Sequence, residues 1–305
     1  MRIAICVLTY KRPDSLARLI AGLDELTFRD RPPEVSVVVV DNDAAGSAGQ
    51  TCRRLAAMLR WPLEYVIEPR RGIPAARNTA LDSAGDAEWI CFIDDDEVPE
   101  PTWLDELLRV QREYDADVVA GPVVSRFDKP IPAWVRKGRF FERPTYANGH
   151  RLQHANTGNV MLRSAIRDAG LRFDERLQLT GGSDRQLFRR VARAGYKIVW
   201  ATDAVVAEWV PKSRVTARWI LQRAFRYGVM TPRIDRDLNP GLLTSVRLPA
   251  IGCYRILKGT FFLPLTWPFG RHHCVTYLRH ICYGAGILAG CFGLRYHEYR
   301  QTHGS

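Results

Sequence analysis

Lysine is scarce in this sequence, and apolar runs long enough to span a bilayer are missing. Only six of the 44 basic residues are lysine, although the chain carries a net charge of +11. An arginine excess suits phosphate or carboxylate ligands, whose geometry the guanidinium fork matches; a GC-rich genome would give the same bias. Because no apolar run reaches the ~20 residues of a membrane-spanning helix, a polytopic membrane protein is excluded. An apolar fraction of 46% instead predicts a globular protein.

A paired set of cysteines is missing as well: the chain has seven, an odd number with irregular spacing, which argues against a secreted disulfide framework. No signal peptide is visible, since the opening apolar run leads straight into Tyr10-Lys11-Arg12-Pro13. We therefore expect a reducing cytoplasm. A histidine and cysteine group near the C-terminus fits no standard zinc spacing. Its members are His272, His273, Cys274, His280, Cys282 and Cys291.

Strand and helix patterns alternate over the first 124 residues, which predicts a mostly parallel sheet flanked by helices. We expect strands at 2–8, 35–40, 63–67, 88–93 and 117–124, and helices at 13–26, 47–59, 74–83 and 101–114. The pattern loosens over 125–156, where proline, aromatic and arginine residues predict an ordered loop or lid. Regular signals then return, with strands at 159–163, 196–200 and 204–210 and helices at 184–194 and 213–230.

The last part of the chain differs in character, so we expect a domain at 1–230, with halves 1–124 and 125–230, followed by a helical segment at 231–305. Stretches 256–270 and 283–294 are apolar and rich in glycine and aromatic residues. Basic residues border them: Arg255, Lys258, Arg271, Arg279, Arg295 and Arg300. This combination suits a segment in a membrane interface; a helical hairpin packed on the domain explains it as well.

Carboxylates and arginines follow the predicted strands, at the edge where open α/β sheets bind ligands. The most distinctive of these groups is Asp94-Asp95-Asp96, which directly follows an apolar strand. Three adjacent carboxylates repel one another, so without a cation they destabilise the fold. Their hard oxygen atoms suit Mg²⁺ or Mn²⁺ bound together with substrate phosphates. A solvated acidic turn or a helix N-cap is the alternative interpretation.

Five motifs, in order along the chain, carry a resemblance to a known family. They are Val7-Leu8-Thr9-Tyr10-Lys11-Arg12-Pro13, Val39-Val40-Asp41-Asn42, Arg71-Gly72-Ile73-Pro74-Ala75-Ala76-Arg77-Asn78, Phe92-Ile93-Asp94-Asp95-Asp96-Glu97 and Thr180-Gly181-Gly182-Ser183-Asp184. The sequence resembles family 2 glycosyltransferases, similar to bacterial enzymes that assemble extracellular or capsular polysaccharide. The resemblance covers nearly the whole chain and implies a GT-A fold, an α/β architecture of Rossmann-like character.

The resemblance also implies how a nucleotide-diphosphate sugar is bound. Residues matched to the nucleotide pocket are Thr9, Tyr10, Arg12, Asp41, Arg77, Asn78, Asp94 and Asp95. Among them, Asp41 matches an aspartate that reads the base, usually uracil, or it caps the next helix. Asp96 matches the metal ligand of the D-x-D motif, while Asp94 contacts the ribose or sugar and shares the Mn²⁺ or Mg²⁺ ion.

On the acceptor side, Asp184 matches the catalytic base. Ser183 stands where many relatives have glutamate, which leaves Asp184 without a local competitor for that role. Glu208 lies where a third metal ligand is often found, or it is a buried paired acid. Arg223 and Arg226 share a helix face and could clamp the leaving diphosphate, although a solvated face or a lipid contact explains them too.

The implied reaction is metal-dependent sugar transfer with inversion to a hydroxyl of a saccharide or polyprenyl-linked acceptor. Aromatic residues of the 125–156 segment would shape the acceptor side: Trp134, Phe140, Phe141 and Tyr146. The basic C-terminal segment would dock on the cytoplasmic face of the inner membrane.

Three other functions compete with this reading. Nucleotidyl transfer lacks support because no glycine-rich, lysine-bearing loop follows the first strand. The acidic strand ends argue against nucleic-acid binding. Intact Asp94, Asp96 and Asp184 argue against an inactive, membrane-associated assembly partner.

Overall fold

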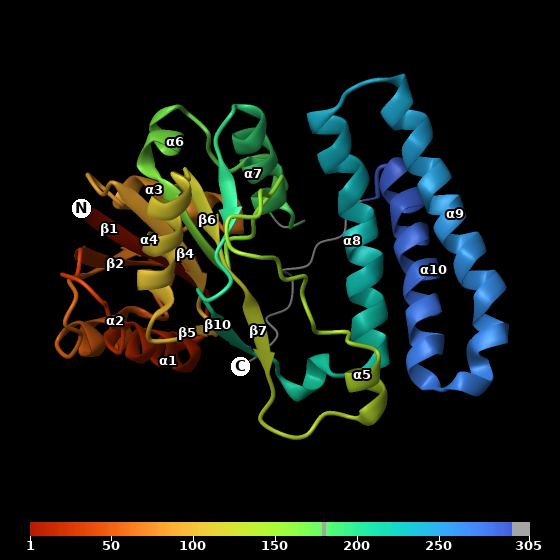
Figure 1. Ribbon diagram of the computed structural model, residues 1–305, viewed down its shortest axis with the longest axis horizontal. Coiled ribbons are helices and arrows are strands. Elements are labelled where there is room, and N and C mark those ends of the chain that lie inside the picture. The colour runs from red at the N-terminus through yellow and green to blue at the C-terminus, as the bar shows by residue number, and fades with distance from the viewer. Residues whose placement is uncertain (179–180, 295–305) are drawn as a thin grey trace. The chain divides into compact units, whose positions relative to one another are not determined.

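The computed structural model describes residues 1–178 and 181–294 (Figure 1). Within these ranges the chain forms two compact units. Residues 1–124 and 143–209 form one, called here the α/β unit, and residues 125–142 and 210–294 form the other, called the helical unit. The chain therefore passes between the units three times. Residue 230, where the sequence suggested a boundary, lies inside the helix α8 (Ala217–Leu238) of the helical unit.

A seven-stranded sheet in the order β3-β2-β1-β4-β8-β6-β9 forms the centre of the α/β unit. Its strands are β1 (Arg2–Thr9), β2 (Glu34–Asp41), β3 (Leu63–Ile67), β4 (Trp89–Asp94), β6 (Val118–Ala120), β8 (Asn159–Arg163) and β9 (Ile198–Trp200). β1 pairs in parallel with β2 and β4, while β8 runs antiparallel to β4 and β6. This mainly parallel sheet confirms the predicted α/β class.

Helices cover both faces of this sheet, and the strands are apolar on both sides for that reason. The helices are α1 (Pro13–Asp24), α2 (Gly49–Ala56), α3 (Ile73–Ser83), α4 (Trp103–Tyr114), α6 (Ser164–Asp168) and α7 (Ser183–Arg193), with a 3₁₀ turn at Glu175–Leu177. Along β1, Ile5 and Val7 belong to one buried cluster, whereas Ala4 and Cys6 belong to the other. The alternation fixes the sheet between two helical layers.

A second, three-stranded sheet has the order β5-β10-β7, formed by β5 (Glu97–Pro99), β10 (Val206–Trp209) and β7 (Val123–Arg126). The single strand predicted at 117–124 is therefore wrong, because β6 and β7 lie in different sheets. The break falls at Gly121-Pro122. A Cβ at Gly121 would lie 2.3 Å from the Ala204 carbonyl oxygen, and proline has no backbone N–H to donate.

The helical unit contains α5 (Ala133–Lys137), α8, α9 (Leu242–Thr266) and α10 (Arg271–Cys291), with 3₁₀ turns at Lys212–Arg214 and Trp267–Phe269. α10 packs against both α8 and α9, so it lies between them (Figure 1). Within residues 1–178 and 181–294, none of the helices combines the length and hydrophobicity that a membrane-spanning segment needs.

The backbones of these three long helices approach closely at glycine residues. A Cβ on Gly286 of α10 would lie 2.1 Å from the Phe225 carbonyl oxygen of α8. On the other side of α10, a Cβ on Gly284 would lie 2.5 Å from the Gly252 carbonyl oxygen of α9. Only glycine fits such positions without moving a helix.

Of the stretch 125–156, for which the sequence predicted an ordered loop or lid, residues 125–142 are part of the helical unit. Phe140 and Phe141 are buried in a cluster with Ile220 of α8 and Val275 of α10. Phe141 stacks on Trp219, with ring centroids 5.7 Å apart, and Trp134 packs against the same cluster. These three predicted acceptor-side aromatics are therefore core residues of the helical unit.

We predict that Gly286→Leu lowers the unfolding temperature, because the new side chain forces α8 and α10 apart. Overpacking of a buried position costs about 1–3 kcal/mol or more. Ala250→Leu is the matched control, since Ala250 is exposed on α9. Thermal unfolding followed by circular dichroism measures both variants. Equal melting temperatures for Gly286→Leu and the wild type would refute the close packing.

Candidate active site

Three parallel strands bring the predicted site residues to one edge of the main sheet. Thr9, the last residue of β1, is level with Asp41, the last residue of β2. Its neighbour Leu8 is level with Asp94, the last residue of β4. Because carboxyl ends of parallel strands share an edge, this register accounts for the convergence that the motifs implied.

Arg12 and Thr9 hold the second and third carboxylates of the acidic triplet. The Thr9 hydroxyl donates to Asp95 Oδ2 at 2.8 Å. Arg12 Nη1 donates to Asp95 Oδ1 at 3.2 Å and to Asp96 Oδ2 at 3.1 Å. Burial raises the pKa of Asp95 to about 7, against the opposing effect of Arg12. Burial alone would lower the pKa of Arg12. The negative charges of Asp95 and Asp96 have the larger combined effect, so the Arg12 pKa is raised.

The side chain of Asp94 is in a different situation. Its backbone N–H donates to Glu97 Oε2 at 3.0 Å, but no side chain or backbone group among the described residues donates a hydrogen bond to its carboxylate. Burial raises the pKa of Asp94 to about 6, with further contributions from Asp96 and Glu208. Arg77 and Arg143 oppose this increase, but they offset it only in part.

Glu97 and Glu208 extend this negative charge. They lie opposite each other in the β5–β10 pair, and burial raises the pKa of Glu97 well above its usual range. Glu208 forms an ion pair with Arg143, which agrees with the alternative that Glu208 is a paired acid. Its role as a metal ligand stays a prediction. No three histidine, cysteine or acidic side chains among the described residues are arranged around one point as metal ligands.

Asp41 is fully buried at the end of β2, and both of its carboxylate oxygens are engaged. Oδ1 accepts from the Asp43 backbone N–H at 3.0 Å, and Oδ2 accepts from the Ala48 N–H at 2.8 Å and the Tyr65 hydroxyl at 2.9 Å. These bonds hold the turn between β2 and α2, but the N-cap residue of α2 is Ala48, so Asp41 does not cap the helix as the alternative interpretation expected. The predicted contact with the base stays a prediction.

Tyr10 lies beside two cations. Arg71 lies over its ring at 5.0 Å from the centroid, and Lys11 lies at 5.3 Å. A ring between positive charges offers a stacking surface next to anion-binding groups. The predicted contact of Tyr10 with a nucleotide stays a prediction.

Arg77 and Asn78 tie α3 to the start of α7. Arg77, 8% exposed, donates to the Ser183 hydroxyl at 3.0 Å and lies over the Phe173 ring. Asn78 donates to the Phe173 carbonyl oxygen and accepts from the Phe173 N–H, both at 3.0 Å. Asn78 is thus a structural clamp. No local sequence pattern predicts the Arg77–Ser183 contact, because the two residues are distant along the chain.

Asp184 lies in the first turn of α7, one residue beyond Ser183. A helix N-terminus stabilises a nearby negative charge, and Asp184 Oδ1 accepts from the Arg185 N–H at 2.8 Å. His154 interacts electrostatically with Asp184 and Arg185 in this turn. Burial and Arg185 lower the pKa of His154, whereas Asp184 opposes them. Sequence reasoning missed His154, since the stretch around it shows no periodic pattern.

Three residues named from the sequence lie outside the described residues. They are Thr180, from the motif that contains Asp184, and Arg295 and Arg300.

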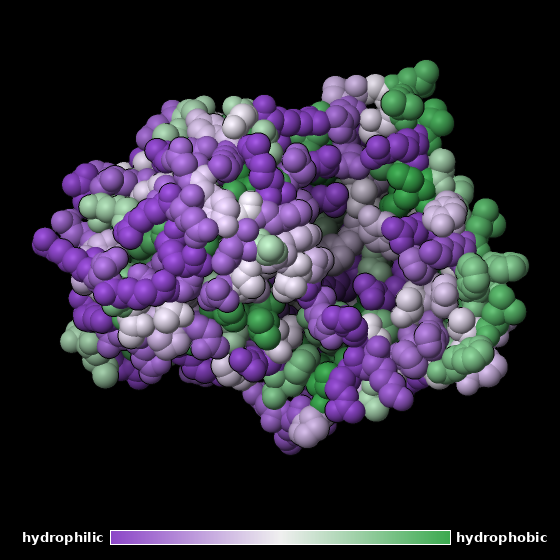
Figure 2. Space-filling view, in the orientation of Figure 1, coloured by the Kyte–Doolittle hydropathy of each residue, from purple (hydrophilic) through white to green (hydrophobic). Residues whose placement is uncertain are grey.

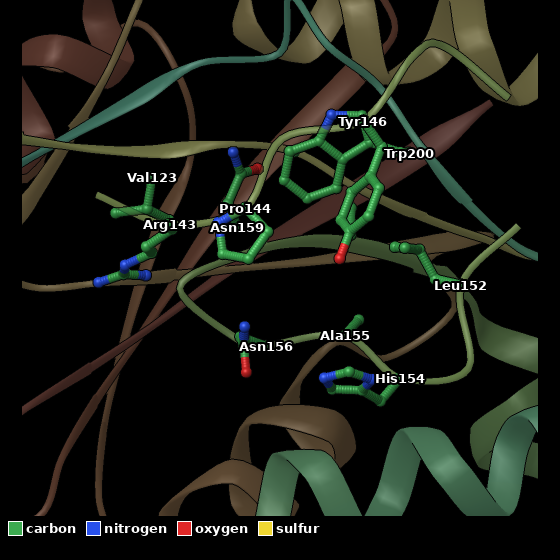
Figure 3. Close-up of a pocket in the computed structure, with 12 residues that line it drawn as sticks. Val123, Arg143, Pro144, Tyr146, Leu152, His154, Ala155, Asn156, Asn159 and Trp200 are labelled. Carbon is green, nitrogen blue, oxygen red and sulfur yellow. The ribbon is translucent and has the colours of Figure 1, made fainter. Parts of the chain in front are cut away.

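A cavity of about 110 Å³ opens beside these residues, within the α/β unit. Figure 3 shows Arg143, Tyr146, His154, Asn156 and Trp200 around it. The Tyr146 ring stacks on His150 with centroids 4.6 Å apart and meets Trp200 edge-on. Among the aromatic residues predicted for the acceptor side, Tyr146 is the one that reaches this cavity.

Arg223 and Arg226 belong to the helical unit, unlike the other candidates. Arg223 Nε donates to the Tyr227 hydroxyl at 3.1 Å, and its guanidinium lies over Trp219. Arg226 lies over the Tyr227 ring at 5.6 Å. Their expected contact with a diphosphate stays a prediction.

Comparison with known proteins adds independent findings. The sequence profile of the family described as "Glycosyl transferase family 2" matches residues 4–170. The chain is 33% identical over 301 residues to "Succinoglycan biosynthesis protein ExoM" of Rhizobium meliloti (strain 1021), covering 97% of this chain and 94% of that protein.

Solved structures with similar folds include the mannosyltransferase PcManGT from Pyrobaculum calidifontis in complex with GDP-Man and Mn²⁺. That match has a TM-score of 0.66 and 16% identity, and it covers 94% of this chain and 86% of the other. S. aureus TarS 1–349 in complex with UDP-GlcNAc matches with a TM-score of 0.55 and 16% identity, over 98% and 93% of the two chains. At such identities the likeness concerns the fold. Taken with the profile match and the full-length relative, it leads to one conclusion: the chain belongs to glycosyl transferase family 2 and has the GT-A fold.

Proposed function

We propose that this chain transfers a sugar from a nucleotide-diphosphate donor, which we expect to be a UDP-sugar, to a hydroxyl of a saccharide or polyprenyl-linked acceptor. The observation that carries the proposal is the half-buried Asp94 carboxylate, which has no hydrogen-bond donor among the described residues and lies beside Asp96 at the sheet edge. The two similar structures, which are complexes with GDP-Man and UDP-GlcNAc, support the donor class.

The acidic group fits a divalent cation, Mn²⁺ or Mg²⁺, because it offers hard oxygen atoms whose charge the neighbouring arginines offset only in part. Asp94 and Asp96 would hold the ion, with Glu208 as the third candidate. When bound, such an ion neutralises the diphosphate and makes it a better leaving group. Arg12 keeps the Asp96 carboxylate in place through its 3.1 Å ion pair.

Asp184 is the proposed general base. It would take the proton from the acceptor hydroxyl as that oxygen attacks the anomeric carbon. Attack from the side opposite the diphosphate inverts the anomeric centre. Arg77 supports this geometry, because its hydrogen bond to Ser183 holds the first turn of α7, where Asp184 lies.

The cavity beside His154 is the proposed acceptor side. Tyr146 offers an aromatic face on which a sugar ring can stack, and Arg143 and Asn156 offer hydrogen-bond donors at the rim. The name of the relative ExoM, a succinoglycan biosynthesis protein, supports polysaccharide assembly as the process.

We also propose a peripheral contact with the cytoplasmic face of the inner membrane, where a lipid-linked acceptor would be reached. The region from 231 onward is the expected contact, because it is apolar and basic.

We predict metal-dependent binding of one nucleotide diphosphate. Isothermal titration with UDP, GDP and dTDP, each with Mn²⁺ or with EDTA, should show one binder whose affinity falls at least about tenfold with EDTA. Asp96→Ala should cause a similar loss, since it removes a charged ligand. Asp128→Ala, at an exposed position, is the control. Equal binding by Asp96→Ala and the wild type would contradict the metal role.

We predict that Asp184→Asn lowers the rate of nucleotide release from the donor by about 10²–10⁴, the usual contribution of a general base. Nucleotide affinity should stay within twofold of the wild type, because Asp184 is not placed at the diphosphate. Asp203→Asn, at an exposed position, controls for the charge change. A variant that loses nucleotide binding and rate together would assign Asp184 to the donor pocket and end its role as base.

A further inference from the structure

The helix α9 has two apolar sides, and only one of them is covered. Leu248, Gly252 and Gly259 are buried, and the two glycines pack against α10. The opposite side carries large apolar residues that are between 55% and 82% exposed. They are Leu243, Val246, Tyr254, Leu257, Phe261 and Leu265.

These exposed residues recur every three or four positions except between Val246 and Tyr254, where the exposed Ala250 stands, so they form one continuous stripe along the helix. We call it the outer stripe of α9. Trp267 and Phe269, in the turn after α9, continue it with exposures of 73% and 69%. Figure 2 shows the hydrophobic side chains gathered over α9. Proteins rarely leave contiguous apolar patches of this kind in water unless something binds them.

The charge around the stripe indicates what binds it. From residue 238 to residue 297 the sequence has no aspartate or glutamate. The same span has basic residues at Arg247, Arg255, Lys258, Arg271, Arg279 and Arg295. Arg247 keeps a 62% exposed side chain, although it lies 3.8 Å from Asp235. An apolar stripe on a span that has several basic residues and no acidic residue of its own fits an anionic surface with an apolar interior.

A second copy of the chain fits less well. Two outer stripes packed together would bring Arg247 and Lys258 of each copy near the same residues of the other, and the 238–297 span supplies no carboxylate to pair with them. Like charges brought together at an interface oppose association.

The geometry also sets the orientation of α9. A helix of 25 residues is about 37 Å long at 1.5 Å per residue. Since the stripe runs along its whole length and α10 covers the other side, α9 suits a position parallel to a membrane surface. The second apolar stretch of the sequence, 283–294, behaves differently, because Gly284, Gly286 and Ile287 of α10 are buried.

We propose that the outer stripe of α9, together with Trp267 and Phe269, inserts in-plane into the interface of a membrane that contains anionic lipids. Aromatic residues at this turn are suited to the headgroup level. This membrane contact is the one named in the proposed function, and only its purpose, access to a lipid-linked acceptor, rests on that function. The membrane-binding surface itself follows from the exposed residues of α9.

Flotation of the full chain with vesicles tests the proposal. Vesicles of phosphatidylcholine alone are compared with vesicles of phosphatidylcholine mixed with phosphatidylglycerol. The wild type should partition onto the mixed vesicles at least about tenfold more strongly, and added salt should reduce this preference.

Leu257→Glu and Met58→Glu form a matched pair, because both replace an exposed apolar residue, 69% and 75% exposed, by the same charge. Leu257→Glu should lower partitioning about tenfold or more, and Met58→Glu should stay within twofold of the wild type. Both should melt like the wild type, since neither side chain is packed inside. Lys258→Gln should lower binding to the mixed vesicles about fivefold and leave binding to phosphatidylcholine unchanged.

Three results would overturn the proposal. The first is a folded wild type that binds neither vesicle, and the second is Leu257→Glu binding as the wild type does. The third is a dimer in sedimentation velocity that Leu257→Glu dissociates, without vesicle binding, which would assign the stripe to an interface between copies. Nucleotide titration of the same preparations separates the two proposals, because loss of nucleotide binding with intact flotation would affect only the proposed function.

Discussion

Burial of like charges at the end of β4 is the constraint on which the candidate site depends. Asp94, Asp95 and Glu97 all have raised pKa values because they are buried together. Arg12 and Thr9 stabilise Asp95, and Arg12 reaches Asp96 as well, but the Asp94 carboxylate receives no hydrogen bond from the described residues. A fold that keeps such a group stores a local electrostatic cost, which a cationic ligand can relieve.

The register of the sheet places this electrostatic cost at the sheet edge, where a ligand can bind. β1, β2 and β4 end level with one another, so that Thr9, Asp41 and Asp94 meet at one edge. α3 and α7 then contribute Arg77 and Ser183, which contact each other across the chain. The catalytic side chains proposed here thus depend on backbone elements whose own stability comes from two large apolar clusters.

Much of the α/β unit could be predicted, because buried parallel strands are encoded locally by apolar runs. The strand at 35–40 and the helix at 74–83 are examples. The break at Gly121-Pro122 escaped prediction, since it depends on the Ala204 carbonyl oxygen from a distant strand. Phe140 and Phe141 were assigned to the wrong surface for the same reason: their partners, Ile220 and Val275, come much later in the chain. The contacts of Arg77 and Arg143 are equally non-local.

The route of the chain through the helical unit has a consequence for synthesis and for truncation. Residues 125–142 leave the ribosome long before α8 and α10, yet Val135, Phe140 and Phe141 belong to a buried cluster that includes Ile220 of α8 and Val275 of α10. Contacts of such large sequence separation form late and slowly, so these aromatic side chains are exposed in the nascent chain until its last helices appear. The helical unit is therefore not an independent C-terminal segment, because removal of α10 would also expose residues of the 125–142 segment.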